Sequence, residues 1–197
     1  LDLIVNPEVQ DTFVKRTRII SYIRKYLDER GFLEVQTPVL QSIAGGAHAR
    51  PFITHHNALD IDMYMRIATE LYLKRLLVGG LERVYEIGPN FRNEGIDTKH
   101  SPEFYMLEVY QAYADYNDMM DLVEEMISGC AMEVLGTTKL RAEGHEIDLT
   151  PPWKRLKVWD GITQLCGIRP EDLRDDQDAK AVVEKLQLKM DKAVTVG

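Results

Sequence analysis

The sequence predicts an α+β fold, in which an antiparallel β-sheet carries helices on its faces. Two long segments, one before residue 31 and one after residue 115, space their apolar residues as amphipathic helices do. Between them, residues 83–114 have the composition of strands joined by a polar loop. No glycine-rich turn joins a strand to a helix, which argues against a Rossmann fold.

Length, composition and charge exclude some classes of function but do not assign one. The chain has 197 residues, the size of one domain, and can bury a core. Its net charge of −8 argues against a simple RNA-binding module, because such modules hold nucleic acid with a basic surface. Two cysteines, Cys130 and Cys166, lack metal-like spacing and fit a reducing cytoplasm. We find no membrane span or signal peptide, and expect a fragment because Leu1 replaces an initiator Met.

The first helix is predicted to begin at Asn6, with Pro7 in the first turn and Glu8 opposing the helix dipole. Gly31 is predicted to end it. Its apolar residues form a broad band, made of Val9, Phe13, Ile19, Ile20, Tyr22, Ile23, Tyr26 and Leu27. A band this wide predicts burial on more than one side of the helix.

The middle of the chain is predicted to hold short strands over residues 52–54 and 64–67. A helix over residues 70–78 follows and stops at a pair of glycines. A further strand is predicted over residues 83–87.

A second long helix is predicted to open near Asp115 and to close at Gly136. Its apolar stripe consists of Met119, Leu122, Val123, Met126, Ile127, Cys130 and Val134. Because Cys130 lies on this stripe, we expect it to pack in the core. The acidic residues off the stripe are predicted to form a solvated face, and they are Asp118, Asp121, Glu124, Glu125 and Glu133.

The last part of the chain is predicted to contain two strands, over residues 146–149 and 155–158, on either side of a proline pair. A charged helical segment runs on through residue 186. Residues 194–197 are expected to add no closing element, and no repeat or linker divides the chain.

The hairpin predicted over residues 91–114 contains the first candidate site. In an extended segment, Arg92 and Glu94 share one face, and we expect the loop that follows to span residues 96–99. A guanidinium on rigid β backbone suits bidentate capture of a phosphate or carboxylate. The alternative is a cross-strand salt bridge on a solvated face.

The returning strand, residues 103–114, has two unlike faces. One face is predicted to pack under helices and carries Tyr105, Leu107 and Val109. The other face carries Phe104, Met106, Glu108 and Tyr110. A carboxylate in such surroundings needs a cationic or hydrogen-bonding partner. That partner is either the ammonium of a ligand or a basic side chain such as Arg92.

These segments resemble a known family. Residues 91–94 with residues 100–104 resemble motif 2 (about 90–114) of the class II aminoacyl-tRNA synthetases, and residues 31–38, after the first helix, resemble their motif 1 (about 6–38). Three further blocks are similar to the lysyl-tRNA synthetases: Gly-Gly-Ala at 45–47 leading into 49–57 with its Thr-His-His-Asn, residues 66–74, and residues 108–116. Aspartyl and asparaginyl relatives would share the two motifs but not the Gly-Gly-Ala and Thr-His-His-Asn blocks. The match runs from residue 1 to about residue 165.

The resemblance implies ATP-dependent activation of L-lysine and its ligation to tRNA(Lys) by way of lysyl-adenylate. The catalytic residue would be Arg92, bridging the α-phosphate of ATP and the carboxylate of lysine. The other ATP-binding residues would be Asn93 and Glu94 at the adenine, His100 and Ser101 at the outer phosphates, and Phe104 stacked on the base.

For lysine, the resemblance implies that Glu70 and the backbone of Gly46 hold the α-amino group, and that Glu108 and Tyr110 hold the ε-ammonium. Two alternatives stay open from the residues themselves, since Gly46 also suits a plain turn and Glu70 a dipole-capping role. Adjacent histidines on a strand point to opposite faces, so we assign His55 and His56 structural roles and not a shared metal.

The chain departs from the family pattern in several places. Ser101 stands where the family usually has Asn, and Thr69 where it often has Pro. Motif 3, the acidic ligands of Mg²⁺ and the anticodon-binding domain have no counterpart here. We therefore expect residues 1–197 to be part of a cytoplasmic catalytic domain, homodimeric through motif 1, with its Mg²⁺ ligands beyond the chain end. By itself this piece is expected to bind ATP or lysine weakly.

Two other functions remain possible from the sequence. A truncated paralogue could attach lysine to a protein such as elongation factor P, although the Thr-His-His-Asn block counts against it. A non-catalytic synthetase-like binding module would also lack motif 3. For the first helix, burial wholly inside one subunit competes with the dimer interface that the family places there.

Overall fold

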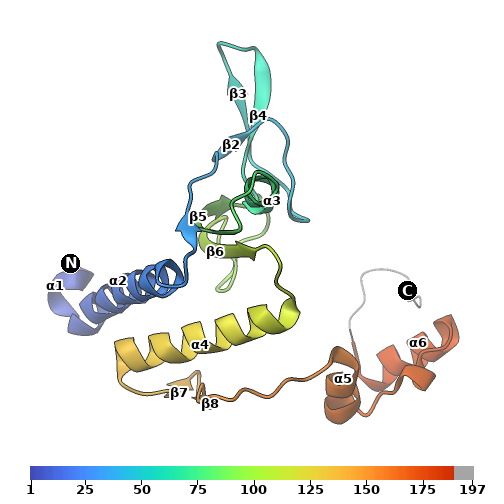
Figure 1. The fold of residues 1–197 in the computed structure, drawn as a ribbon. Coiled ribbons are helices and arrows are strands. Elements are labelled where there is room, and N and C mark those ends of the chain that lie inside the picture. Colours follow the sequence, from blue (N-terminus) through green and yellow to red (C-terminus); the bar gives the residue numbers. More distant parts are fainter. Residues whose placement is uncertain (189–197) are drawn as a thin grey trace. The chain divides into compact units, whose positions relative to one another are not determined.

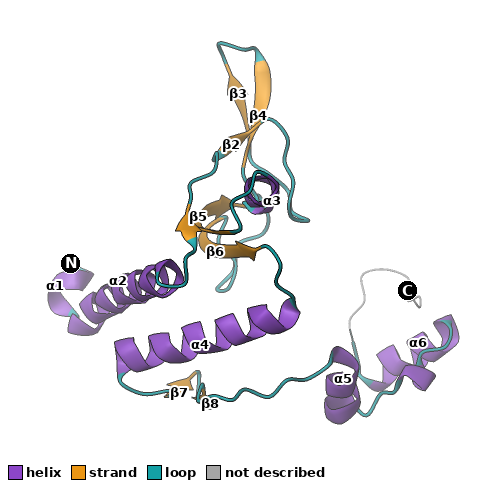
Figure 2. Ribbon diagram, in the orientation of Figure 1, coloured by secondary structure: helices purple, strands orange, loops and turns teal. Residues whose placement is uncertain are grey.

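The computed structural model describes residues 1–188 and divides the chain into two compact units, Leu1–Pro151 and Pro152–Gly197. Figure 1 shows the order of the elements, and Figure 2 separates helices from strands. Helices and mainly antiparallel sheets together confirm the predicted α+β class. The predictions for residues 194–197 lie outside the described part of the chain.

The first unit opens with two helices, α1 (Asp2–Val5) and α2 (Pro7–Asp28). The predicted start of α2 is confirmed, but the Asn6 amide donates to the Asp2 carboxylate and does not cap α2. The chain leaves α2 through a turn in which Gly31 has a φ of 76°, a left-handed conformation that glycine adopts without strain.

The central sheet has the strand order β1-β5-β6, built from Leu33–Glu34, Arg83–Phe91 and Glu103–Gln111. β1 runs parallel to β5, and β5 pairs antiparallel with β6 along nine residues. The predicted hairpin is therefore present, and its first strand is longer than the predicted residues 83–87.

A second sheet has the order β2-β4-β3, from Leu40–Gln41, Ile61–Met65 and Ile53–His56. Both predicted strands are present, each displaced by a few residues. After β4 comes α3 (Glu70–Val78), whose bounds agree with the prediction.

The helix α4 (Tyr116–Leu135) confirms the second long helix. The Asp115 carboxylate accepts from the backbone of Asn117 and Asp118, and the Asp118 side chain accepts from the Asp115 backbone. This reciprocal box satisfies backbone groups that a helix start leaves free. Gly136, with a φ of 73°, closes the helix as expected. One part of the predicted solvated face is wrong, because Glu124 is buried.

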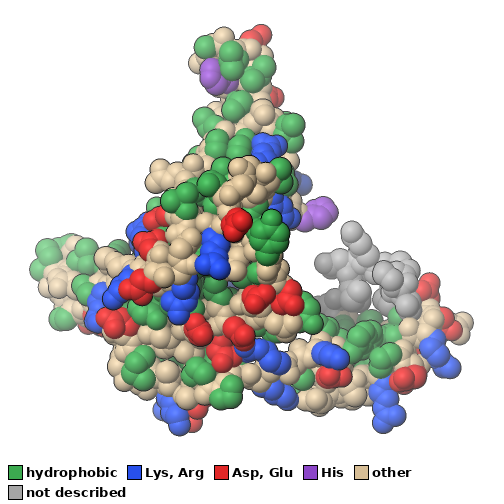
Figure 3. Space-filling model, in the orientation of Figure 1, with side chains coloured by type: hydrophobic (Ala, Val, Ile, Leu, Met, Phe, Trp, Pro, Cys, Tyr) green, Lys and Arg blue, Asp and Glu red, His purple; other side chains and the backbone are tan. Residues whose placement is uncertain are grey.

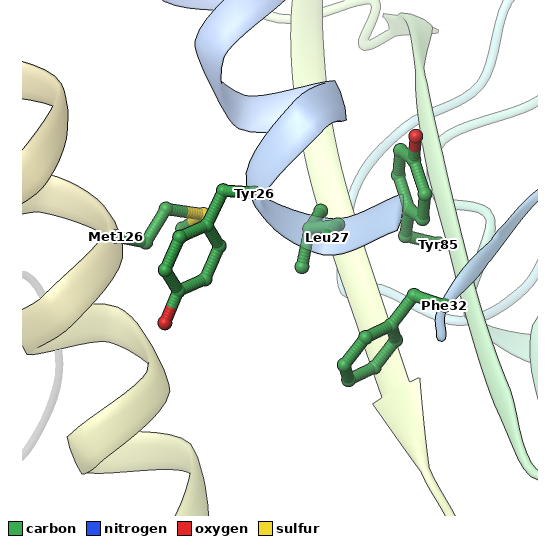
Figure 4. Packing of buried hydrophobic residues seen from close by; sticks show 5 residues of the cluster. All are labelled: Tyr26, Leu27, Phe32, Tyr85 and Met126. Carbon is green, nitrogen blue, oxygen red and sulfur yellow. The ribbon is translucent and has the colours of Figure 1, made fainter. Parts of the chain in front are cut away.

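The core of this unit lies where α2, α4 and the hairpin meet. Figure 4 shows the packed cluster, which consists of Tyr26, Leu27, Phe32, Tyr85 and Met126. Leu107 and Val109 of β6 pack against this cluster, as predicted for their face. Tyr105 does not, because its ring is 59% exposed and lies under the Arg16 guanidinium at 5.2 Å.

The alternative that α2 is buried wholly inside one subunit is wrong, because within this chain the helix is not covered on several sides. Only Tyr26 and Leu27 of α2 are buried, and Phe13 and Val14 are more than half exposed. Apolar side chains of α1 and α2 therefore lie on the surface, and green atoms cover the N-terminal end of the molecule in Figure 3.

The predicted strand over residues 155–158 is also wrong. The strand β8 (His145–Asp148) pairs instead with β7 (Lys139–Ala142), which the sequence analysis missed. Glu143 and Gly144 join them with positive φ at both positions, the geometry of a tight hairpin turn. Residues 153–157 have no such partner strand, and Val158 begins a helix.

The second unit contains α5 (Val158–Cys166), a 3₁₀ turn (Pro170–Asp172) and α6 (Asp176–Lys185). The helical character predicted for this region is confirmed. Among the residues that the structure describes, no helix is both long and apolar enough to cross a membrane.

Candidate active site

The face of the β5–β6 hairpin that points away from the core carries most of the candidate residues. Pairing places Glu86 opposite Glu108, Val84 opposite Tyr110, and Asn90 opposite Phe104. Residues directly opposite each other in an antiparallel pair project to the same side of the sheet. The alternation of β6 therefore brings Phe104, Glu108 and Tyr110 onto one surface, as predicted.

Glu108 is held by two neutral donors. The Thr69 amide donates to Oε1 at 3.2 Å, and the Tyr110 hydroxyl donates to Oε2 at 3.1 Å. No Lys or Arg among residues 1–188 forms an ion pair with this half-buried carboxylate, so the predicted alternative of an internal pair with Arg92 is wrong. A carboxylate with hydrogen-bond donors but no counter-charge can accept a cation.

The pKa of the Tyr110 hydroxyl is affected by two carboxylates, Glu108 and Glu70. Burial, followed by the nearby charge of Glu108 and the hydrogen bond to it, raises the pKa of the Tyr110 hydroxyl above its ordinary value. The charge of Glu70 adds to this rise in pKa. Tyr110 therefore stays protonated and remains a donor to Glu108 at physiological pH.

Gly46 lies against the start of α3. It has a φ of 85°, and a Cβ there would lie 3.1 Å from the Glu70 Cβ and 3.2 Å from the Ala68 Cβ. A Cβ on Gly45 would lie 2.8 Å from the Leu71 side chain. The two glycines thus bring backbone close to Glu70, whose carboxylate also pairs with Lys74 at 2.5 Å.

Arg92 lies just beyond the end of β5. Its Cζ is 5.1 Å from the centre of the Phe104 ring, and its Nη2 is 3.5 Å from the Ile67 carbonyl oxygen. The alternative of a cross-strand salt bridge is wrong, because no ion pair joins Arg92 to a carboxylate among the described residues, and Glu94 accepts from the Arg50 amide at 3.4 Å. Within the described residues Arg92 has no carboxylate partner, so its charge is available to an anion.

The predicted extent of the hairpin loop is wrong. It spans residues 92–102 and not 96–99, so Arg92 and Glu94 do not lie on a strand. The backbone of this loop no longer continues the pairing of β5 with β6, since the Asn93 amide donates to the Arg50 carbonyl at 2.7 Å. The Arg92 amide still reaches the Pro102 carbonyl at 2.9 Å, which fixes the base of the loop.

The exposed tip of this loop carries His100 and Ser101. His100 Nδ1 lies 2.7 Å from an Asp97 carboxylate oxygen, and the Lys99 and His100 amides donate to the other oxygen at 2.7 and 2.8 Å. These hydrogen bonds lower the pKa of Asp97, with the His100 side chain as the largest cause. The bonds of His100 are thus local, and they do not join it to Glu108 or Arg92.

Three buried polar atoms of the described residues lack a hydrogen-bond partner, and all three belong to this region: Thr69 Oγ1, Asn90 Oδ1 and Arg92 Nε. A buried polar group without a partner costs about 1–3 kcal/mol, so such groups are rare in a folded protein. Their concentration around one surface indicates a site that a polar ligand or water completes.

Sequence reasoning missed a buried ion pair beside the site. Arg66 follows β4 directly and pairs with Glu86 of β5, and both side chains are almost fully buried. The available signal was a single charged residue inside each of two otherwise apolar strand-like runs, at 64–67 and 84–87.

The two histidines of β3 make local contacts. His55 lies between Asp62 at 3.3 Å and Asp60 at 3.2 Å, and His56 Nδ1 accepts from the Leu59 amide at 3.3 Å. Over residues 1–188, no group of three or more His, Cys, Asp or Glu side chains is arranged to hold a metal ion.

Comparison with known proteins gives a consistent result. The family model described as tRNA synthetases class II (D, K and N) matches residues 1–190. The chain is 60% identical over 192 residues to a lysine–tRNA ligase of Clostridium botulinum (strain Loch Maree / Type A3), 58% to that of C. botulinum (strain Hall) and 57% to that of C. perfringens (strain 13). Each alignment covers 98% of this chain and 38% of the relative, so the chain spans well under half the length of these proteins.

Proposed function

This chain belongs to the class II tRNA synthetases of the D, K and N group, and on that premise we propose that the intact protein activates L-lysine with ATP and ligates it to tRNA(Lys) through lysyl-adenylate. Residues 1–197 would form part of its catalytic domain, in a cytoplasmic enzyme. The names of the similar clostridial proteins support lysine as the amino acid.

The observation that carries this proposal is the Glu108 carboxylate. It receives hydrogen bonds from the Thr69 amide and the Tyr110 hydroxyl, yet has no cationic partner among residues 1–188. An ε-ammonium supplies the missing positive charge and further hydrogen bonds. A neutral or acidic amino acid would leave Glu108 uncompensated in a half-buried position.

The other end of lysine would lie at the junction of Gly46 and α3. There the backbone of Gly46 and the Glu70 carboxylate are proposed to hold the α-amino group. The close approach of Gly46 to the Glu70 Cβ supports this arrangement. Glu70 already pairs with Lys74, so it would divide its oxygens between Lys74 and the substrate.

ATP would lie along the Arg92 side of the hairpin. Arg92 is proposed to bridge the α-phosphate and the lysine carboxylate, Asn93 and Glu94 to bind adenine, and His100 and Ser101 to approach the outer phosphates. Phe104 would stack on the base through the ring face that the Arg92 guanidinium leaves free. The unpartnered Arg92 Nε supports an anion at this place.

In this reaction the amino-acid carboxylate attacks the α-phosphate in line, and pyrophosphate leaves. No protein nucleophile takes part, so the residues act by holding two negatively charged reactants together and by offsetting the charge that develops at phosphorus. Mg²⁺ is part of the proposal as a counter-ion of ATP. The described residues do not form a ligand set for it.

We further propose that the protein is a homodimer through motif 1, about residues 6–38. The support is the exposure of apolar side chains on its helix α2, namely Phe13, Val14 and Ile19. Large apolar side chains gathered on the surface of a folded protein mark an interaction site.

Lysine-dependent exchange of pyrophosphate into ATP, measured on the intact protein, tests the proposed function. Replacing Glu108→Gln should raise the KM for lysine by about 100-fold, because truncating a buried charge pair costs roughly 2–5 kcal/mol. The KM for ATP should stay within about twofold, since Glu108 lies at the ammonium end.

Glu103→Gln is the matched control, because Glu103 is exposed at the start of the same strand and should leave both constants unchanged. Exchange that depends on aspartate or asparagine and not on lysine would refute the proposed substrate.

A further inference from the structure

Arg66 is anchored on several sides at the back of the proposed lysine site. Its side chain is 1% exposed and pairs with Glu86 Oε1. Its Nε donates to the Pro89 carbonyl at 2.7 Å, and its Nη1 to the Thr37 carbonyl at 3.1 Å. A guanidinium with fixed carbonyl and carboxylate partners on two segments has little freedom to move.

The hairpin backbone makes room for this arginine. Gly88 lies two residues after Glu86 on the same face of β5, and a Cβ there would lie 2.3 Å from Arg66 Nη2. Any other residue at this position would displace the guanidinium. The strand thus includes a specific space for the positive charge.

Glu86 and Glu108 lie directly opposite each other across β5 and β6. Opposite residues have Cβ atoms about 4.5–5.5 Å apart, and like charges at that separation repel. Arg66 compensates Glu86, and the Thr37 hydroxyl donates to the remaining Glu86 oxygen at 2.7 Å. Of the two opposed carboxylates, Glu108 is therefore the one left without a counter-charge among the described residues.

We propose that Arg66 is a positioning residue for the ammonium site: by pairing with Glu86, it leaves Glu108 as the uncompensated member of the two opposed carboxylates among residues 1–188, open to the ε-ammonium. This inference rests on the proposed function, since it assumes that the site takes lysine. Glu70 does not change the balance, because Lys74 already pairs with it.

The proposal predicts in which direction lysine affinity changes when each charge is removed. If the Glu86 charge is removed, Arg66 becomes an uncompensated cation beside the residue that lies opposite Glu108. Held in place by the Pro89 and Thr37 carbonyls, Arg66 would then repel the ε-ammonium. If both charges are removed together, the repulsion disappears and lysine binding returns.

The test is calorimetric titration of the intact protein with lysine and, separately, with ATP. Glu86→Gln should raise the Kd for lysine by at least about tenfold and change the Kd for ATP by less than about twofold, because the freed cation acts at the ammonium end. The double variant Arg66→Met with Glu86→Gln should bring the lysine Kd back to within about threefold of wild type, as buried ion pairs can be exchanged for neutral residues.

Glu34→Gln is the matched control, since it removes the carboxylate that pairs with Arg24 at 3.0 Å on the neighbouring strand β1. It should leave lysine binding unchanged. Circular dichroism of each variant confirms that it is folded.

The outcomes separate three explanations. If Glu86→Gln weakens lysine and ATP binding equally, or if the double variant binds lysine no better than the single one, the pair is only structural and the proposal is wrong. If wild type does not bind lysine at all, the proposed function fails first.

Should Glu86→Gln not fold, Thr37→Val serves as the second variant, since it keeps both charges and removes one hydroxyl. Lysine affinity within about twofold of wild type supports the role of the Arg66–Glu86 charge pair. A tenfold loss of lysine affinity with unchanged ATP affinity would show that the hydrogen bonds of Thr37, and not the charges, determine lysine binding.

Discussion

At Gly88, the absence of a side chain decides where a charge can lie. The nearest atom to a Cβ built there is Arg66 Nη2, at 2.3 Å, and Arg66 is confined by the Pro89 and Thr37 carbonyls. The backbone at Gly88 does not have positive φ, so conformational freedom is not the reason for glycine. Space for the buried guanidinium is the reason.

Gly88→Ala should therefore lower the free energy of unfolding by about 3 kcal/mol, because overpacking at a rigid site forces the backbone or a buried ion pair to move. Urea denaturation measures this change. Gly95→Ala is the control, since a Cβ at Gly95 meets nothing within 4 Å and its φ is ordinary. Equal stability of the two variants would contradict the steric explanation.

At the scale of elements, α2 and α4 are joined by a polar contact at the edge of the apolar cluster. The Tyr26 hydroxyl donates to Glu125 at 3.0 Å and lies 3.3 Å from the Leu122 carbonyl. The Arg30 guanidinium lies 3.6 Å from the centre of the Tyr26 ring and also binds Glu125. Burial, and then the hydrogen bond to Glu125, raises the pKa of Tyr26 to about 12.

This pKa predicts loss of stability at alkaline pH. Because the folded-state pKa lies above the ordinary value of about 10, the contribution of Tyr26 is complete below pH 10 and is lost as the pH rises towards 12. The total is about 2–3 kcal/mol, from roughly two pKa units at 1.36 kcal/mol each. Urea unfolding at several pH values between 9 and 12 measures it.

Tyr26→Phe should reduce this pH dependence by the part that Tyr26 contributes, because it removes the ionisable hydroxyl. Tyr22, Tyr85 and Tyr110, whose pKa values burial also raises, keep the rest. Tyr116→Phe, at a ring that is 74% exposed, should leave the slope as in wild type. An unchanged slope in Tyr26→Phe would assign the whole effect to other groups.

At the scale of the whole molecule, the two ends of α2 differ in how deeply they are buried. The last turn of α2 enters the core through Tyr26 and Leu27, whereas its earlier turns expose Phe13 at 59% and Val14 at 54%. Burying such side chains contributes about 25 cal/mol per Å² of apolar area, so their exposure is costly in a monomer. A second copy of the protein covering this face would recover that free energy.

If this face forms the proposed dimer interface, Phe13→Asp should raise the dimer dissociation constant of the intact protein by at least about 100-fold, since a buried charge replaces an aromatic anchor. Sedimentation velocity over a range of concentrations measures it. Val78→Asp, at the 91% exposed end of α3, is the control and should leave the dimer intact. An unchanged dimer in Phe13→Asp would place the interface elsewhere.

Some features of residues 1–188 could be predicted from the sequence, and others could not. The bounds of α3, the cap at Asp115, the close at Gly136 and the common face of Glu108 and Tyr110 were all predicted correctly. Each depends on residues within a few positions of one another, through caps, helical spacing or strand alternation.

The sequence by itself thus determined the family, the fold class and the identity of the strand that carries the candidate carboxylate. Only the tertiary structure decided that the Thr69 amide binds Glu108 from 39 residues away, that Arg66 neutralises Glu86, and that β8 pairs with β7 instead of residues 155–158. The physical reason is that strand register and buried charge pairing depend on segments distant in sequence. Local propensity contains no information about which distant group lies within hydrogen-bonding reach.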